Sequence, residues 1–417
     1  MAEPKPGGVA PEGDGARPNP RPNPTRRGRF SGLSRDTWLL ALASLFADVS
    51  TEMLYPVLPV FLTQSLHASG AAVGLIEGIA TGVQNIVPGF AGSLSDRLRR
   101  RKPLALIGYA LAAIAKPLIG LSTVWTGVLG ARFLDRLGAG TRSAPRDALL
   151  AASADDAHRG RAFGLEGAGD NAGAFLGPVL TVILLAAWGL DLRWIFYLAI
   201  VPGFLALAMI FFVSEKRPAA GRAKVTFETD ARALPRRYRA YLIATAVAGL
   251  GNSSNAFLIL RTRELGVSLQ ATILIYAAFN LVAALVSYPA GALSDRIGRR
   301  NILLLGLAVF AVSYLGFALI TNLILIGLLF VLYGAYQGIF RAVGKAFASD
   351  MVPEARRAGG IGWYSATVGL SGLVASAVAG LLWDHVGHAA AFAYGASLAA
   401  LGGLALAMLV PAKGGGD

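Results

Sequence analysis

The chain reads Gly92-Ser-Leu-Ser-Asp96-Arg97 in its first half and Gly291-Ala-Leu-Ser-Asp295-Arg296 in its second, 199 residues later. Further pairs of residues share this offset, namely Arg142 with Arg341, Arg146 with Lys345, and Gly173 with Gly372. Matches that keep one register over such a distance indicate that the chain consists of two related halves.

The composition around these repeats is that of a membrane protein. Hydrophobic residues make up 55% of the 417 residues and charged residues only 15%, whereas a soluble chain carries about 25% charged residues. The mean hydropathy is +0.57. The absence of cysteine excludes disulfides, thiolate metal sites and a cysteine nucleophile.

Apolar runs of membrane-spanning length follow one another along the chain. About 20 residues in a helix cross roughly 30 Å of hydrocarbon. We therefore expect an all-α membrane protein with twelve transmembrane helices in two six-helix bundles. The expected spans are 37–63, 71–94, 103–122, 125–147, 163–188, 193–213, 240–261, 269–293, 301–320, 323–347, 361–383 and 390–411.

The basic residues gather in alternate loops. One set of loops holds Arg97, Arg99, Arg100, Arg101, Lys102, Arg159, Arg161, eight residues of 214–239, Arg296, Arg299, Arg300, Arg356 and Arg357. The opposite loops hold only Arg193, Arg261 and Arg263. The positive-inside rule then predicts that both termini are cytoplasmic. It also explains the formal charge of +14 without nucleic acid as a partner.

These observations divide the chain into five segments. Residues 1–33 are rich in Pro, Gly and Arg and cannot bury enough apolar surface to order. The expected segments are a disordered cytoplasmic tail at 1–33, a first bundle at 34–213, a basic cytoplasmic linker at 214–239, a second bundle at 240–412 and a short cytoplasmic tail at 413–417.

The repeated hexapeptide resembles the loop signature of the major facilitator superfamily, G-x-L-[AS]-D-R-x-G-R-[RK]. The first copy has Arg99 in place of the second glycine, whereas the second copy keeps it as Gly298. The resemblance implies a conformational gate made of Gly92, Asp96 and Arg97 and their repeats Gly291, Asp295 and Arg296. The alternative is that these arginines only fix the topology.

Two further spans carry partial family signatures. The fourth resembles R-x-x-Q-G, with Arg132 in place and Asp135-Arg136 where Gln-Gly is usual. The fifth resembles the antiporter signature in Gly164, Gly173, Gly177 and Pro178, but the glycines that should follow are absent. This resemblance implies export. The strings around these signatures resemble a bacterial subgroup in which some members are linked with iron or other metals.

The first span places two carboxylates inside the membrane. Asp48 lies ten residues after Trp38, about 15 Å into the bilayer, and Glu52 lies one turn further on the same face. Carboxylates in a low dielectric oppose each other's ionisation, which suits a proton carrier. Pro56 and Pro59 follow and should bend the helix. A structural pairing of these acids with Arg132 or Arg136 is the alternative.

Other polar residues within the spans complete the expected site. The first half is expected to couple protons and the second to supply a polar and aromatic wall. The coupling candidates are Asp48, Glu52, Arg132, Asp135, Arg136, Glu166 and Asp170. The candidates for the cavity lining are Tyr55, Gln84, Asn85, Lys116, Asn171, Asn252, Asn255, Tyr333, Tyr336, Gln337 and Arg341. Alternatively, Lys116 reaches out to the membrane interface. Arg142, Arg146 and Asp147 could instead anchor loops.

Together these features predict a secondary transporter of the bacterial inner membrane that works by alternating access. No phosphate-binding loop of the Walker type is present, and nothing favours an enzyme, a cofactor or a metal centre, His385 and His388 included. We expect a monomer in membrane lipid that exchanges a drug-like compound or a metal chelate for protons. The alternatives are proton-coupled uptake of a nutrient, chelate or siderophore, transport of a lipid, and a sensor that transports nothing.

Overall fold

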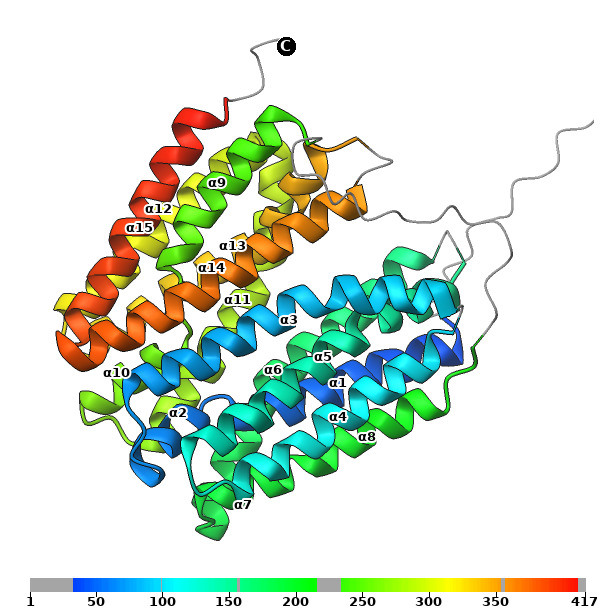
Figure 1. The fold of residues 1–417 in the computed structure, drawn as a ribbon, viewed down its shortest axis with the longest axis horizontal. Coiled ribbons are helices and arrows are strands. Elements are labelled where there is room, and N and C mark those ends of the chain that lie inside the picture. The colour runs from blue at the N-terminus through cyan, green and yellow to red at the C-terminus, as the bar shows by residue number, and fades with distance from the viewer. Residues whose placement is uncertain (1–32, 99, 156–157, 216–233, 354–356, 412–417) are drawn as a thin grey trace, which may run out of the picture.

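The computed structural model describes residues 33–98, 100–155, 158–215, 234–353 and 357–411. The side chains of Asp96, Arg357 and Ala358 also lie outside the description. The described chain is helical and forms two bundles that lie side by side (Figure 1). The expected tails at 1–33 and 413–417 and most of the linker at 214–239 fall outside the described residues.

The first bundle contains six membrane-length segments, two of which are interrupted. The first segment breaks next to Pro56 and Pro59, as the sequence predicts. The elements are α1 (Arg35–Leu54), α2 (Leu58–Val60), the π-helix η1 (Phe61–Ser65), α3 (Gly70–Leu98), α4 (Lys102–Leu121), α5 (Trp125–Ser153), α6 (Arg159–Trp188), α7 (Leu192–Leu198) and α8 (Ile200–Phe211).

The second bundle repeats this plan, again with a broken first segment. Here the break falls at Asn252–Asn255, between α9 and α10, and involves no proline. The elements are α9 (Arg236–Gly251), α10 (Ala256–Glu264), α11 (Leu269–Ile297), α12 (Arg299–Leu319), α13 (Leu323–Asp350), α14 (Arg357–His385) and α15 (His388–Leu409).

Eleven helical segments among the described residues are long and apolar enough to cross a membrane. The segment missing from this set is α5, which has the length of a span but carries Arg132, Asp135 and Arg136 near its middle. It packs against α3 and α4 within the first bundle. These charges lower its mean hydropathy below that of the other spans. With α5 included, the structure has the expected twelve spans.

The two bundles meet along α3 with α14 and along α6 with α11. We call the end where α1 and α9 begin and α8 and α15 stop the linker end, and the opposite end the distal end. The bundles lie close together at the distal end and diverge toward the linker end (Figure 1). Polar residues expected between the bundles, such as Gln84 and Asn171, are accordingly exposed.

Candidate functional site

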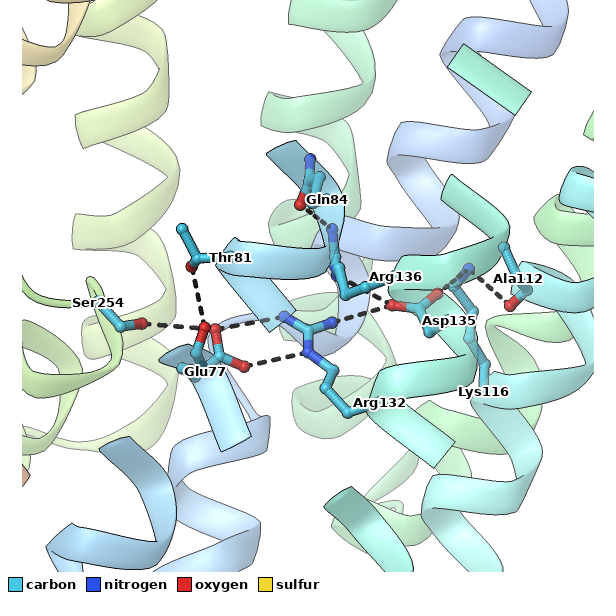
Figure 2. A network of polar contacts seen from close by, with 9 residues as sticks. All are labelled: Glu77, Thr81, Gln84, Ala112, Lys116, Arg132, Asp135, Arg136 and Ser254. Carbon is cyan, nitrogen blue, oxygen red and sulfur yellow. Dashed lines mark hydrogen bonds and ion pairs between the residues drawn. The ribbon is translucent and has the colours of Figure 1, made fainter. Parts of the chain in front are cut away.

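A cluster of charged side chains lies inside the first bundle (Figure 2). Arg132 of α5 is at its centre, with Nε 3.0 Å from Glu77 Oε1 and Nη2 3.4 Å from Glu77 Oε2. Its Nη1 donates to Asp135 Oδ2 at 3.1 Å. All three side chains are buried. Such charges are tolerated in a membrane interior only when they are paired and hydrogen-bonded.

Asp135 extends the cluster to two more cations. Lys116 of α4 lies 3.4 Å from Asp135 Oδ1, and Arg136 Nε lies 3.2 Å from Asp135 Oδ2. Arg136 also donates from Nη1 to Gln84 Oε1 at 2.8 Å. Lys116 is therefore buried in this cluster, which corrects both its expected place in the cavity lining and the alternative that it reaches the interface.

Glu77 connects the cluster to the second bundle. Its Oε2 accepts a hydrogen bond from Ser254 Oγ at 3.4 Å, and Ser254 lies in the break between α9 and α10. Ser254 Oγ also lies 3.1 Å from Tyr55 Oη. The Arg132 guanidinium lies 5.7 Å from the centre of the Tyr55 ring. The candidate residues from the sequence did not include Glu77, although an acid facing a buried arginine is a functional candidate.

Glu52 forms a second contact between the bundles. Its Oε2 accepts a hydrogen bond from Tyr276 Oη at 3.0 Å and lies 3.4 Å from Asn280 Nδ2, both on α11. Asn280 also donates to the Ala174 carbonyl of α6 at 3.2 Å. The Tyr55 and Tyr276 rings stack beside these contacts, with centroids 5.3 Å apart. No described cation forms an ion pair with Glu52.

Asp48 finds its partner on α6. The carboxyl groups of Asp48 and Asp170 face each other within hydrogen-bonding reach, and neither forms an ion pair with a described residue. Helical spacing predicts Glu52 as the neighbour of Asp48. The structure instead places Asp170 directly beside Asp48, while Glu52 turns to α11 but still acts on Asp48 through its charge.

Close packing of α1 on α6 produces this arrangement. A Cβ added to Gly173 would lie 2.7 Å from both Asp48 Cβ and the Leu45 carbonyl, and one added to Gly177 would lie 2.8 Å from the Val49 carbonyl. Small residues four apart let two helix backbones approach in this way. Gly164 of the same signature is exposed and has nothing within 4 Å of an added Cβ, so it does not contribute to this contact.

The remaining charged groups of the first bundle differ in their pairing. Arg146 forms ion pairs with Glu166 at 2.9 Å and with Asp147 at 2.8 Å. Glu166 therefore has a cation as its partner. Arg142 is buried and packs on the Tyr109 ring at 4.4 Å. Its Nε and Nη1 have no hydrogen-bond partner in the described part of the chain. A buried Arg142 whose charge acts on Asp48 does not fit the alternative that it anchors a loop.

In the second bundle, hydroxyl and amide groups meet without charge. Tyr333 Oη lies 3.0 Å from Asn252 Oδ1 and 3.1 Å from Asn255 Oδ1, and Gln337 Nε2 donates to it at 3.0 Å. Tyr336 stacks on a phenylalanine ring with centroids 4.6 Å apart. Because Tyr333 and Tyr336 are buried inside this bundle, their expected place on the cavity wall is corrected.

The residues of the expected gate lie at the linker end. Gly92 packs against Ala144, whose Cβ would lie 3.2 Å from an added Cβ. Arg97 and Arg296 are exposed, and Gly291 has only distant neighbours. Asp295 lies 3.5 Å from Arg299 of its own bundle, whereas the side chain of Asp96 lies outside the described residues.

A different contact closes the distal end. Asp384, at the end of α14, accepts hydrogen bonds from the backbone amides of Gly70 and Ala71 at 2.7 Å each. These amides are the first two of α3 and have no partner within that helix. The third is taken by Ser69 Oγ at 3.2 Å. Along the same interface Gly78 packs directly on the Leu373 carbonyl, and Asn85 packs on Gly369.

The family model described as Major Facilitator Superfamily matches residues 40–242 and 241–416. An uncharacterized MFS-type transporter of Methanocaldococcus jannaschii is 36% identical over 380 residues, which cover 90% of this chain and 94% of the relative. The chain belongs to the major facilitator superfamily. It is therefore a secondary transporter in a membrane and not an enzyme.

Less similar proteins include a multidrug resistance protein and a POT family transporter. A multidrug resistance protein, MdtG of Enterobacter lignolyticus, is 27% identical over 318 residues, which cover 72% of this chain and 74% of the relative. The crystal structure of the POT family transporter PepTSo has a TM-score of 0.76 at 14% identity and covers 90% of this chain and 97% of its own. This structure supports the superfamily fold alone.

Proposed function

We propose that this superfamily member is a proton-coupled transporter in which Asp48 and Asp170 hold the transported proton. One observation carries the proposal: two carboxyl groups face each other between apolar helices without an ion pair to any described cation. Two carboxylates at such a distance cannot both ionise cheaply in a low dielectric, so they share a proton. Loss of that proton then changes the charge between α1 and α6.

The pairing of the other acids supports this assignment. Glu77, Asp135 and Glu166 each lie within 3.4 Å of a Lys or Arg nitrogen, so each of these acids has a cation as its partner. Glu52 lacks such a partner and reaches across to α11. We therefore assign Glu52 a second role, in which its protonation weakens the contact between the bundles.

We place the linker end in the cytoplasm of the cell. Described basic side chains gather there, among them Arg97, Arg100, Arg236, Arg239 and Arg296, which are exposed. This distribution matches the positive-inside rule for an inner-membrane protein. In this orientation the bundles diverge toward the cytoplasm and lie close together at the outer, distal end (Figure 1).

We favour export by proton antiport. The direction is supported by the resemblance of the α6 glycines to an antiporter signature and by the name of the MdtG relative. The substrate is then a drug-like compound or a metal chelate that binds when the acidic pair is deprotonated. The alternative is uptake of the substrate together with a proton, and the experiment below distinguishes the two directions.

The test is growth of a transporter-depleted bacterium that expresses the protein, measured against drugs, metal salts, metal chelates and nutrients. Export predicts raised tolerance to one class of compound, which Asp170→Asn abolishes and which a protonophore collapses. Asp191→Asn, an exposed acid in a distal loop, should keep the wild-type tolerance. Raised sensitivity, or rescue of growth on a limiting nutrient, would establish uptake instead.

A further inference from the structure

Charged side chains of opposite sign that form no ion pair with a described residue lie on the two different bundles. The first bundle presents the acidic pair Asp48 and Asp170, both partly exposed. The second bundle presents Arg341 and, one turn along α13, Lys345, both exposed. Neither cation forms a hydrogen bond or an ion pair with a described side chain. An unpaired cation and an unpaired acid in one protein are groups available to a ligand.

The two groups lie at similar depth in the molecule. Asn280 of α11 bonds to Ala174 of α6, and Asp170 lies one helical turn from Ala174 toward the linker end. Between α11 and α13, a Cβ added to Gly338 would lie 2.5 Å from the Ala283 carbonyl oxygen and 3.2 Å from Ser287 N. Arg341 follows three residues later, again toward the linker end. This register puts Arg341 and Asp170 within about one turn, or ~6 Å, of each other in depth.

The charge of Arg341 also reaches the first bundle. Glu52 of α1 interacts electrostatically with Arg341 as well as with Arg136 and Arg132. Arg132 and Arg136 are already held by Asp135, whereas Arg341 is not held by any described acid. Arg341 is therefore a cation of the second bundle that has no ion pair with a described acid and whose charge acts on Glu52 of the first bundle.

We infer that the substrate is a zwitterion, with its cationic group at Asp48 and Asp170 and its anionic group at Arg341. This inference deepens the proposed function and rests on it. A substrate with a cation alone leaves Arg341 unpaired, and one with an anion alone leaves the acidic pair unpaired. Only a zwitterion satisfies both groups without a net change in charge.

The same geometry explains how protons and substrate exchange. The cationic group of the substrate and the transported proton compete for one pair of carboxylates. Binding of the substrate therefore favours release of the proton, and binding of the proton favours release of the substrate, as antiport requires. Arg341 does not take part in this exchange, so it selects the substrate without carrying the proton.

The test uses purified protein in liposomes with a pH-sensitive dye inside. The probes are matched sets: an amino acid, its methyl ester and its N-acetyl derivative, each set built on a leucine, phenylalanine or tryptophan side chain or on a dialanine peptide. The ester keeps only the cation and the acetyl form only the anion. We expect the zwitterions to drive proton flux at least tenfold faster than the other two forms.

Variants separate the inference from the proposed function. Arg341→Gln should slow the flux driven by zwitterions about tenfold and leave the flux driven by esters unchanged. The matched control is Arg239→Gln, an exposed arginine at the start of α9, which should behave as wild type. Flux driven equally well by esters in the wild type, or a zwitterion preference that survives Arg341→Gln, would overturn the inference and leave proton coupling intact. Absence of flux with every probe would overturn both.

Discussion

Arg132 holds two carboxylates at once, and its removal is the sharpest test of the buried cluster. Arg132→Ala leaves Glu77 without a described cation in a dry interior. Breaking a buried pair in this way costs about 3–5 kcal/mol. We expect a large loss of thermal stability in detergent, followed by the fluorescence of the buried aromatic residues.

The pairing itself is tested by a double-mutant cycle. Glu77→Gln with Arg132→Gln should cost clearly less than the sum of the two single changes, because no unpaired charge remains. Costs that add within about 0.5 kcal/mol would show that the two side chains do not interact.

The acidic pair makes a prediction about function at the same scale. Asp48→Asn removes the proton site but preserves the shape of the side chain next to Gly173. Transport against a gradient should stop, while exchange of labelled substrate across the membrane continues, because exchange does not require net proton movement. Gradient-driven transport that persists in this variant would remove Asp48 from the mechanism.

Single residues also show what the sequence was able to predict. Intramembrane charge alone identified Asp48, Arg132 and Asp170 as candidates. It did not identify Glu77, and it did not show that Asp170 lies directly beside Asp48. Helical spacing relates residues on one helix, whereas the partner of Asp48 depends on how α6 packs on α1. That packing depends on both helices, so the sequence of either helix alone does not predict it.

Among helices, the contact of α1 with α6 depends on the absence of a side chain at Gly173. Gly173→Val adds atoms where an added Cβ already lies 2.7 Å from backbone and Asp48. We expect little folded protein in the membrane, or protein without transport. Gly164→Val, at the exposed glycine of the same signature, should retain wild-type expression and transport. Wild-type expression and transport in both variants would show that α1 and α6 do not pack closely at Gly173.

The closed distal end depends on the contact of Asp384 with α3. An acid at a helix N-terminus contributes about 0.3–2 kcal/mol, so Asp384→Ala should shift the equilibrium between the conformations by a factor of about 2 to 30. The chain has no cysteine, so spin labels at Gln64→Cys in η1 and at Thr321→Cys in the loop between α12 and α13, both exposed, can report the distance. We expect a longer distance in Asp384→Ala; an unchanged distribution would show that this contact does not hold the end closed.

At the scale of elements, hydropathy predicted more than packing did. The twelve spans were placed to within a few residues, because apolar length is a local property. The interruption near Pro56 was predicted from proline, whereas the break at Asn252–Asn255 had no such signal. The close packing of α3 on α14 was also missed, since neither helix shows in its own sequence which face meets the other bundle.

For the whole molecule, the internal repeat correctly predicted two bundles. It did not predict the difference between them. The first bundle buries five charged side chains in one cluster, whereas the described part of its counterpart buries mainly tyrosines and hydroxyl groups, with Asn280 and Arg261. This asymmetry is consistent with our proposal that one bundle handles the proton and that the other contributes Arg341 to the substrate.

The central claim is that substrate movement is coupled to a proton held by Asp48 and Asp170. The most direct test records proton flux and substrate flux together in liposomes that contain the purified protein. We predict that an imposed pH gradient drives the substrate uphill in wild-type protein, and that the double variant Asp48→Asn/Asp170→Asn, which has lost the carboxylates for both the proton and the cationic group, moves neither protons nor substrate uphill. Uphill movement in the double variant, or substrate flux in the wild type without any proton flux, would contradict the account.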